Sequence, residues 1–423
     1  MKVLVIGNGG REHALVEAIS KSSRVNKIYC APGNAGTAEK AENLNIQVFN
    51  INRLATFARE NKIDLTVVGP EVPLMLGIVD EFRKSGLLVF GPTAKAAKLE
   101  TSKIFAKDIM QKYNVPTADF VICKTKEDTL AAVEGKDFPY VIKVDGLAAG
   151  KGAMVILNQE DLDEAVRAIW DDAKFGEAAN NIIIEDFLEG EELSVFVITD
   201  GENYVMLHPA QDHKRAYDDD KGPNTGGMGT YAPAPLGSFE VLKNIEKVVI
   251  KPVLNGMKNE GCPYTGVLYC GLMIAENLPS VVEFNVRFGD PEAQVILPLI
   301  ESDVIELLKG AAKGNISSRS FKLKNKSACC VVLASGGYPD SYEKNKEITG
   351  INNVPDDVMI YHAGTELKNG KIYTSGGRVL GVTALADSLQ EAIAKSYEQV
   401  KQIKFEKMQY RNDIGKKGLA RDN

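Results

Sequence analysis

Short apolar segments alternate with helical segments through the first hundred residues, and this alternation constrains the fold more than any other feature of the chain. Strands are expected over residues 3–6, 27–30, 46–49, 65–68 and 89–90, and helices over residues 13–20, 54–61 and 76–85. Strands that alternate with helices form a parallel sheet that is covered on both faces. The sequence therefore predicts an N-terminal α/β domain, residues 1–101, built on a doubly wound parallel sheet.

The turn after the first strand, residues 7–12, is rich in glycine but does not fit a dinucleotide site. Such a site needs glycine where Glu12 stands and an acidic residue at the end of the second strand, which here ends in Cys30. A nicotinamide oxidoreductase is excluded on these two points. Ligands still bind at the carboxyl edge of such sheets. We therefore expect a small phosphorylated substrate at this edge, near Gly9 and Gly10.

Charge and cysteine usage narrow the class of protein further. The 423 residues carry a net charge of -7 without a long basic run, which argues against nucleic acid as a partner. The longest apolar runs fall short of a membrane span, and the chain begins directly with a strand, so neither a membrane segment nor a signal peptide is expected. Six cysteines without a CxxC pair suggest reduced thiols in a cytoplasmic protein. We expect a monomer, with a dimer as the alternative.

Residues 123–189 are expected to form a small α+β unit centred on a strand, a glycine-rich loop and a second strand. The loop contains Gly146, Gly150, Lys151 and Gly152. It is not a Walker A loop, because the spacing is one residue short, no Ser or Thr follows Lys151, and a strand follows in place of a helix. A flexible loop of small residues can nevertheless fold its backbone N–H groups over a triphosphate.

Lysines and glutamates near this unit have two interpretations each. Lys143 lies inside an apolar strand, where an anionic partner is the usual reason for a lysine and an ammonium that reaches solvent is the alternative. Lys103 and Lys107 lie in a helix that starts at a Thr101 or Ser102 cap, and by themselves they indicate a solvated face. The connector from Glu185 to Glu192 is either an adenine slot with a ribose-binding carboxylate or a charged surface turn.

Residues 102–122 and 190–324 are expected to form a larger α+β layer with a polar strand near its end. In residues 281–288, Val282, Phe284, Val286 and Phe288 would face one side, and Glu283, Asn285 and Arg287 the other. Oxygen ligands select a hard cation such as Mg²⁺, and a guanidinium suits a phosphate or carboxylate. The alternative is an edge strand with a solvated polar face.

Residues 211–229 contain a mixed-charge run and three glycines within four residues. The run includes Asp212, Lys214 and Arg215, and Asn224 follows. A long loop in a globular protein is usually functional or disordered, so either a substrate loop or a solvated charge run is expected. The tail, residues 325–423, is expected to form a small C-terminal α+β domain that closes one side of the site.

Five segments together resemble the glycinamide ribonucleotide synthetase (phosphoribosylamine–glycine ligase) family of the ATP-grasp superfamily. They are residues 7–13, 145–152, 210–215, 222–229 and 283–292, and the resemblance extends over essentially the whole chain. It implies an ATP-grasp core of two α+β units. It also implies the reaction of ATP, 5-phosphoribosylamine and glycine to ADP, phosphate and glycinamide ribonucleotide, the second step of de novo purine synthesis.

The resemblance also implies roles for individual residues. Nucleotide binding would involve Lys103, Lys143, Gly146, Gly150, Lys151, Gly152, Glu185, Leu188 and Glu192, with Glu185 and Leu188 at adenine and Glu192 at the ribose. Glu283 and Asn285 would hold Mg²⁺ or Mn²⁺. The candidates for binding the amine, carboxylate or ribose phosphate are Gly9, Gly10, Asp212, Lys214, Arg215, Asn224 and Arg287.

One departure and one hypothesis complete the interpretation. Many ATP-grasp enzymes have another acidic ligand about a dozen residues before the Glu-x-Asn pair, but residues 270–274 contain no carboxylate, so a second metal is not assumed. For the chemistry, we expect glycine to attack the γ-phosphate and the amine to attack the resulting glycyl phosphate. Neither step needs a protein nucleophile; charge neutralisation by Lys143 and Arg287 is what the steps require. The alternatives are a nucleotide-sensing module and an ATP-grasp carboxylase.

Overall fold

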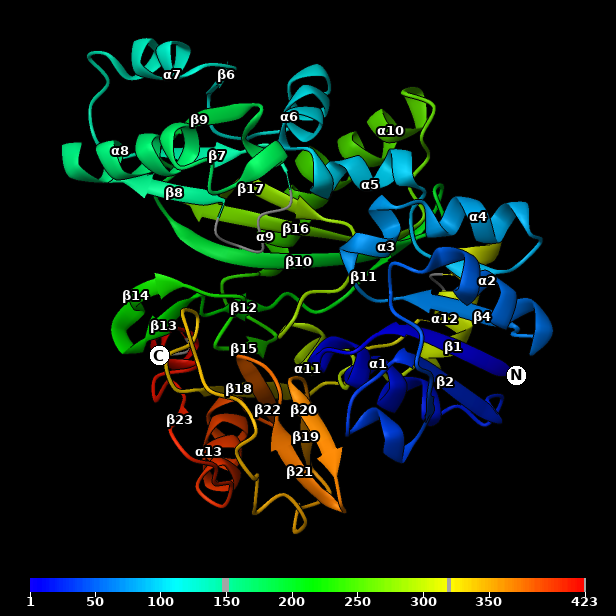
Figure 1. The fold of residues 1–423 in the computed structure, drawn as a ribbon. Helices are drawn as coiled ribbons and strands as arrows, with labels where there is room; N and C mark the ends of the chain where they lie inside the picture. Colours follow the sequence, from blue (N-terminus) through cyan, green and yellow to red (C-terminus); the bar gives the residue numbers. More distant parts are fainter. Residues whose placement is uncertain (147–151, 318–320, 422–423) are drawn as a thin grey trace.

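The computed structural model describes residues 1–146, 152–317 and 321–421. Its N-terminal domain is a parallel sheet in the order β3-β2-β1-β4-β5, with helices on both faces (Figure 1). The strands are β1 (Lys2–Gly7), β2 (Lys27–Pro32), β3 (Glu42–Asn43), β4 (Leu65–Val68) and β5 (Val89–Phe90). The helices are α1 (Gly10–Ser20), α2 (Ile51–Glu60), α3 (Glu71–Met75), α4 (Ile78–Lys84) and α5 (Ala94–Thr101).

The doubly wound sheet predicted from the alternating pattern is confirmed, with two local corrections. Val3, Leu4, Val5 and Ile6 of β1 are all fully buried, and each such side chain stabilises the fold by about 1.5–3 kcal/mol. The strand expected over residues 46–49 is absent, because the chain pairs with β2 earlier, at Glu42–Asn43. The helix expected over residues 76–85 is found as α4, which begins after Gly77, whose φ of 81° suits glycine, and a short helix that was not expected, α3, precedes it.

The core layer is an antiparallel sheet in the order β11-β10-β16-β17. Its strands are β10 (Glu191–Thr199), β11 (Tyr204–Met206), β16 (Gly266–Ala275) and β17 (Leu278–Asn285); its helices are α6 (Lys103–Lys112), α9 (Phe239–Ile245), α10 (Lys251–Asn259), α11 (Ala293–Ile296) and α12 (Val304–Lys313). The helix expected from residue 291 to about 300 is therefore only one turn long. No helix in the described part of the chain is long and apolar enough to cross a membrane.

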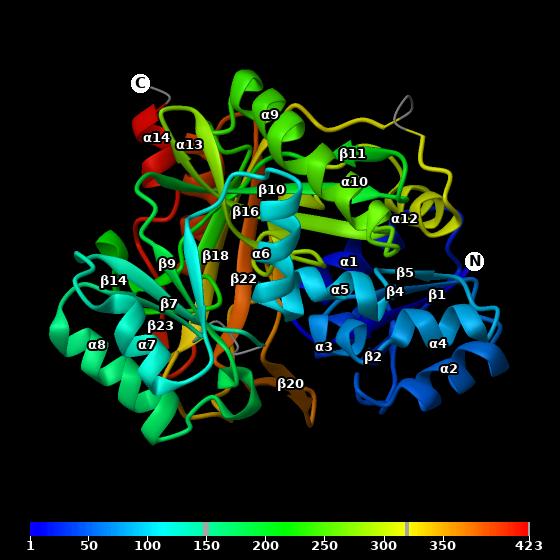
Figure 2. The ribbon, with the colours of Figure 1, turned by 90° about the horizontal axis from the view of Figure 1, so that it is seen from above.

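The small unit that we call the lid has its own sheet, in the order β6-β9-β7-β8, and its own core. It consists of β6 (Phe120–Cys123), β7 (Tyr140–Val144), β8 (Ala153–Ile156), β9 (Ile182–Asp186), α7 (Lys126–Val133) and α8 (Gln159–Val166). Seen from above, α6 stands between the lid and the N-terminal domain (Figure 2).

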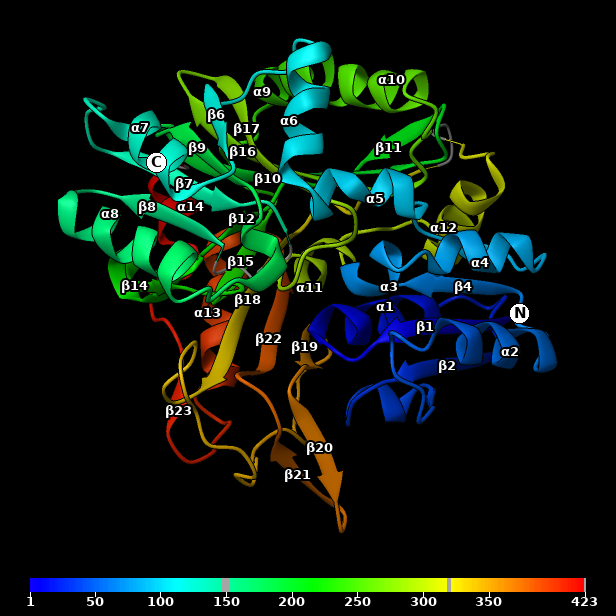
Figure 3. The same ribbon diagram turned by 45° about the horizontal axis from the view of Figure 1, so that its top comes forward.

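A further sheet joins the core layer to the C-terminal region. Its order is β12-β15-β18-β22-β19, with β23 paired to β18. It contains β12 (Gln211–Asp212), β15 (Gly229–Ala232), β18 (Ser327–Ser335), β19 (Val358–His362), β22 (Arg378–Ala386) and β23 (Met408–Gln409), and α13 (Leu389–Val400) and α14 (Lys416–Arg421) lie nearby. The hairpin β20 (Thr365–Lys368)–β21 (Lys371–Thr374) projects from the rest of the protein (Figure 3).

Candidate active site

Strand β17 brings two oxygen donors to the place where the lid meets the core. The pairing of β17 with β16 contains a bulge, so that Glu283 lies opposite Gly271 while Val281 lies opposite Leu272. Val282 is the extra residue, and its carbonyl accepts a hydrogen bond of 3.0 Å from Nζ of Lys143 in the lid. Extra residues of this kind re-aim neighbouring side chains.

The observed strand differs from the expected one in two places. Val281 is fully buried and Val282 only partly, so the alternation is wrong at Val282, whereas Phe284 is buried as expected. The strand ends at Asn285, so that Arg287 follows it in a bend.

Three lysines from different segments surround Glu283: Lys103 begins α6, Lys143 lies in β7, and Lys214 immediately precedes β13 (Arg215–Tyr217). Glu283 is open to solvent on one side. Desolvation by the surrounding protein acts to raise its pKa, but nearby cations outweigh this effect and hold the pKa below its usual value: Lys214, Lys143, Lys103 and Arg287. Glu283 is therefore anionic and faces several cations, as a phosphate-binding metal site requires.

Lys143 is buried because it has an anionic partner. Its Nζ lies 2.8 Å from Oε2 of Glu185, so the alternative of a solvated ammonium is wrong. Glu185 also lies 3.3 Å from Nζ of Lys107, which donates to Thr117 and Ala118 as well. Lys107 is only 2 % exposed, and burial lowers its pKa to about 8 although Glu185 opposes the shift. The interpretation of Lys107 as a solvated surface lysine was wrong.

The connector between the lid and the core ends in an ion pair. Oε2 of Glu192, near the start of β10, lies 2.7 Å from Nζ of Lys214. Burial acts to lower the pKa of Lys214, but Glu192 and Glu283 raise it above its usual value. Leu188 is half-buried between β9 and β10. Lys214 thus pairs with the carboxylate expected at a ribose and lies close enough to the carboxylate expected at a metal to lower its pKa.

The described ends of the glycine-rich loop are tied to α6 and to the lid. The carbonyl of Gly146 accepts a hydrogen bond of 3.2 Å from Nζ of Lys103, and a Cβ at Gly146 would lie 2.7 Å from that of Ala178. At the other end, the carbonyl of Gly152 accepts from Val144 at 2.9 Å. Gly150 and Lys151, which we expected to contact nucleotide, lie outside the described residues.

Glu283 and Asn285 suit a hard divalent cation by their chemistry. Their side chains approach each other, with Nδ2 of Asn285 3.5 Å from Oε1 of Glu283, and oxygen donors of these types bind Mg²⁺ and Mn²⁺. No group of three His, Cys, Asp or Glu residues in the described ranges could hold a metal. Gly271, opposite Glu283, supplies no carboxylate; a Cβ there would lie 3.2 Å from Cγ of Glu283. Among the described residues, Glu283 and Asn285 thus stay the two predicted metal ligands at this place.

Arg287 connects the end of β17 to the N-terminal domain. Its guanidinium lies 2.9 Å from Glu100 in α5 and 3.5 Å from Glu71 in α3, and Nη1 donates to the carbonyl of Phe288. Burial raises the pKa of Glu100 although Arg287 opposes the shift. The structure thus gives Arg287 two carboxylate partners that sequence reasoning missed, and its expected contact with substrate stays a prediction.

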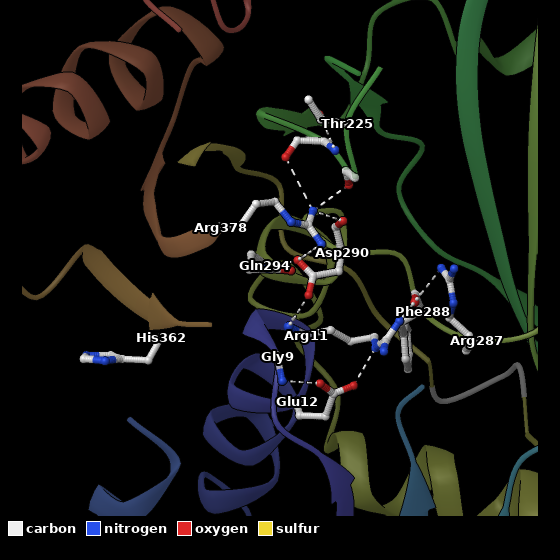
Figure 4. Close-up of polar contacts among 12 residues, drawn as sticks. Gly9, Arg11, Glu12, Thr225, Arg287, Phe288, Asp290, Gln294, His362 and Arg378 are labelled. Atoms are coloured by element: carbon white, nitrogen blue, oxygen red, sulfur yellow. Dashed lines mark hydrogen bonds and ion pairs between the residues drawn. The ribbon is translucent and has the colours of Figure 1, made fainter. Parts of the chain in front are cut away.

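Two carboxylates accept hydrogen bonds from backbone N–H groups at the start of α1, beside Gly9 and Gly10. The N–H of Gly9 donates to Oε2 of Glu12 at 2.6 Å, and the N–H of Arg11 donates to Oδ2 of Asp290 at 3.3 Å (Figure 4). A Cβ at Gly10 would lie 2.4 Å from Nε2 of Gln294. The glycines therefore allow the core segment after β17 to approach the helix closely.

The segment expected as a long loop, residues 212–229, contains the hairpin β13–β14 (Lys221–Asn224), in which Arg215 pairs with Asn224. Nη1 of Arg215 donates to the carbonyl of Gly222. Asp212 lies at the base of the segment, where burial and the nearby Glu292 raise its pKa well above the usual value.

The acidic run of this segment is exposed at Asp219 and Asp220, as the alternative of a solvated charge run expected, but it also pairs with the C-terminal tail. Arg411, only 1 % exposed, lies 2.8 Å from Asp220 and donates to the carbonyl of Arg215. Asp218 accepts from the backbone and side chain of Asn412. The end of the chain accordingly lies beside the hairpin in Figure 1.

The structure thus brings some of the predicted site residues together around Glu283 and places the others farther from it. Around Glu283 lie Asn285, Lys103, Lys143 and Lys214, followed by Glu185 and Glu192. Gly9 and Gly10 lie at α1, and Arg215 and Asn224 lie in the hairpin. Sequence reasoning missed Glu100, Asp290, Arg378 and Arg411, since ion pairs between residues so far apart in the sequence leave no local pattern.

Comparison with known families finds three consecutive matches along the chain. Residues 1–100 match the N domain of phosphoribosylglycinamide synthetase, residues 101–293 its ATP-grasp (A) domain, and residues 328–417 its C domain.

Individual relatives agree with these matches. Phosphoribosylamine–glycine ligase of Caldanaerobacter subterraneus is 48% identical over 98% of this chain and 99% of its own length. The human trifunctional purine biosynthetic protein adenosine-3 is 46% identical over 99% of this chain and 42% of its own length. The crystal structure of the Thermotoga maritima phosphoribosylamine–glycine ligase is 35% identical, with a TM-score of 0.84 over 98% of this chain and all of that one. Biotin carboxylase of Campylobacter jejuni, 17% identical over 97% of this chain and 92% of its own with a TM-score of 0.72, shares the fold.

Proposed function

Because this chain belongs to the phosphoribosylglycinamide synthetase family, we infer that it ligates glycine to phosphoribosylamine with consumption of ATP, in purine biosynthesis. The observation that carries the inference is the match of all three domains in order, together with 48% identity to a phosphoribosylamine–glycine ligase over 98% of the chain. The likeness to biotin carboxylases concerns the fold alone and gives no support to a carboxylase.

The nucleotide binds between the lid and the core. Lys103 and Lys143 contact its phosphates, and the loop of residues 146–152, with Gly146, Gly150, Lys151 and Gly152, covers them. This is supported by the convergence of Lys103 and Lys143 on Glu283. Because the carboxylate of Glu185 is engaged by two lysines, its contact with adenine is made by the main chain, beside Leu188.

Glu192 binds the ribose hydroxyls, and its partner Lys214 then turns toward the phosphates. The ion pair of 2.7 Å between these two side chains supports this assignment, because a carboxylate held this way is already oriented. Charge-assisted hydrogen bonds from hydroxyls would replace the one from the ammonium.

Glu283 and Asn285 hold a divalent cation, Mg²⁺ or Mn²⁺, which supplies charge neutralisation at the phosphates when bound. The two oxygen donors and the anionic state of Glu283 support this assignment. The two side chains would thus hold the cation by oxygen donors, which hard divalent cations prefer.

The reaction proceeds in two steps through glycyl phosphate. A carboxylate oxygen of glycine attacks the γ-phosphorus, the bond to the β-phosphate oxygen breaks, and ADP leaves. The nitrogen of phosphoribosylamine then attacks the acyl carbon; the C–O bond to phosphate breaks, and the nitrogen loses a proton. Lys143 and Lys214 neutralise charge on the transferred group, with Arg287 as a further cation. Closure of the lid excludes water from the acyl phosphate.

The amine and the glycine bind on the core side of this site, toward the N-terminal domain. Asp212, Arg215 and Asn224 are the candidates from residues 212–229, and Gly9 and Gly10 line the edge that receives the ribose phosphate. The high pKa of Asp212 supports a polar contact there, since desolvation and Glu292 make that carboxyl more basic than usual.

The test measures ADP release with phosphoribosylamine generated in situ, omitting glycine, the amine or the metal in turn. We expect sustained ADP release only when glycine, the metal and an amine acceptor are all present; with hydroxylamine in place of phosphoribosylamine, we expect ADP together with glycyl hydroxamate from the trapped intermediate. ADP release that persists without glycine would refute the proposed function. Absence of hydroxamate at full overall activity would refute the intermediate alone.

The protein acts as a monomer in the cytoplasm, with a dimer as the alternative. All six cysteines are buried free thiols, which supports a reducing compartment. Sedimentation equilibrium at micromolar concentration distinguishes monomer from dimer, and cell fractionation with antibody detection tests the compartment.

A further inference from the structure

Arg378 connects three parts of the protein, although it belongs to the C-terminal domain. It begins β22, at a bulge opposite Ala334. Its Nη1 lies 2.5 Å from the carbonyl oxygen of Gly226 and 2.5 Å from that of Asp290. Its Nη2 lies 3.5 Å from Oδ1 of Asp290. The guanidinium therefore bridges residues 212–229, which we call the substrate segment, and the chain beyond β17 (Figure 4).

The substrate segment is shaped to receive this guanidinium. A Cβ at Gly226 would lie 3.0 Å from Cζ of Arg378, so glycine here lets the guanidinium lie against the backbone without a shift. Gly227 has a φ of 110°, and a Cβ on it would lie 2.8 Å from Oδ1 of Asp212. By binding Gly226, Arg378 therefore also keeps Gly227, whose carbonyl it contacts at 3.4 Å, against Asp212.

A second side chain of the C-terminal domain holds the same place. The hydroxyl of Tyr338 accepts a hydrogen bond of 3.1 Å from the N–H of Gly226. The peptide of Gly226 is therefore bound on both sides by the C-terminal domain, through its carbonyl by Arg378 and through its N–H by Tyr338.

On its other side, Arg378 stabilises a carboxylate that caps α1. Asp290 accepts from the N–H of Arg11 through Oδ2 and from Nε2 of Gln294 through Oδ1, at 2.9 Å. Burial acts to raise the pKa of Asp290, but Arg378 and Arg11 lower it. Asp290 is therefore a charged acceptor, and it fixes the start of α1 relative to the substrate segment.

We propose that Arg378 is a positioning residue for the amine and glycine half of the site, through which the C-terminal domain fixes Gly226 and Gly227 against Asp212 and fixes Asp290 against α1. The proposal rests on the proposed function. Its guanidinium contacts main-chain carbonyls and a carboxylate, so Arg378 acts on substrates through the segment that it holds. The nucleotide side of the site, around Lys143 and Glu185, has no contact with it among the described residues.

The test compares Arg378→Met and Arg378→Lys with the wild type by the ADP-release assay, varying each substrate separately. We expect Arg378→Met to raise the KM for glycine and for phosphoribosylamine by about tenfold and to lower kcat/KM for both by up to about 10²-fold, as displacement of positioning groups by about 1 Å does. The KM for ATP should stay within about twofold. Arg378→Lys should recover only part of the loss, because a single ammonium, with a shorter total reach and without the fork of the guanidinium, does not bridge both segments.

Two further variants keep the test decisive. Tyr338→Phe removes one hydroxyl and should raise the same two KM values by about two- to fivefold, as loss of one hydrogen bond does; it carries the test if Arg378→Met does not fold. Lys346→Met is the matched control, since it removes a cation of the same domain that pairs with exposed Glu343 and Glu406, and its KM values should equal those of the wild type.

A structural readout accompanies the kinetics. Trypsin cleaves after Lys214, Arg215 and Lys221, and cleavage there should be faster in Arg378→Met at a temperature where the rest of the chain resists. A rise in the KM for phosphoribosylamine alone would mean that Arg378 contacts the phosphate directly and would overturn the proposal. Equal rises for all three substrates, unchanged kinetics, or full recovery by lysine would overturn it as well. A wild type without glycine-dependent ADP release would instead refute the proposed function.

Discussion

Replacement of Arg411 by methionine tests whether the buried ion pairs of the C-terminal tail stabilise the fold. In the wild type the guanidinium lies 2.8 and 2.7 Å from the two oxygens of Asp413 and 2.8 Å from Asp220, and it donates to the carbonyl of Arg215 at 3.1 Å. Methionine fills a similar volume but leaves two carboxylates with fewer partners. Removing one partner of a buried ion pair costs about 3–5 kcal/mol.

The expected size of the thermal effect follows from chain length. The unfolding entropy of globular proteins is about 2.1 cal/mol/K per residue, which for 423 residues amounts to about 0.9 kcal/mol/K if the chain unfolds as one unit. A loss of 3–5 kcal/mol therefore lowers Tm by about 3–6 °C, and by more if the C-terminal domain unfolds separately. Differential scanning calorimetry at pH 7 measures the shift.

Lys407→Met is the matched control in the same domain. Lys407 pairs with Glu343, and both side chains are more than half exposed, so the pair contributes about 0–1 kcal/mol. A Tm shift in Arg411→Met that is no larger than the shift in Lys407→Met would refute the reasoning from burial.

The pH dependence gives an independent check with a definite sign. Hydrogen bonds and charge from Arg411 and its neighbours lower the pKa of Asp413 and of Asp220 in the folded state, against desolvation. Stability from such groups is present above the unfolded pKa of about 3.9 and is lost as pH falls. The difference in the free energy of unfolding between wild type and Arg411→Met should therefore shrink by about 1 kcal/mol as the pH falls from 5 to 3.5. A gap that stays constant over this range would contradict the lowered pKa values.

Three further substitutions test the site. Glu283→Gln should lower kcat by about 10²-fold or more at saturating Mg²⁺. Near-normal ADP release would refute the assignment of Glu283 as a metal ligand. Glu192→Ala should mainly raise the KM for ATP; a lower kcat at unchanged KM would contradict a ribose contact. Gly10→Ala should destabilise the protein by about 1–3 kcal/mol, because its Cβ would lie 2.4 Å from Nε2 of Gln294; urea denaturation should find this loss reduced in a Gly10→Ala, Gln294→Ala double variant.

Periodicity predicted the elements that bury a continuous apolar face. The strands β1, β2, β4 and β5 and the N-cap of α6 at Ser102 follow the expected positions. The strand expected over residues 46–49 failed for a different reason: pairing with β2 is decided by register, and residues 42–43 reach Tyr29 and Cys30 first. The apolar residues of a segment do not indicate which strand the segment pairs with.

The candidate site was predictable where a polar residue interrupts an apolar segment. Lys143 stood out for this reason, and its partner Glu185 lies on the adjacent strand β9, two residues beyond Ile183, which pairs with Lys143. Lys107 did not stand out, because it belongs to a helix with other lysines, and only tertiary packing buries it. The bulge at Val282 was likewise invisible, since it arises from pairing with β16 rather than from the residues of β17 alone.

The sheet shared by the core and the C-terminal region pairs strands that are translated at different times. Strand β15 frames the substrate segment and pairs with β18, which is translated roughly 100 residues later. At about 5–20 residues per second, that edge waits about 5–20 s for its partner. Because Arg378 and Arg411 are translated later still, the segment of residues 212–229 meets these partners only after the residues around Lys143 and Glu283 have all been synthesised.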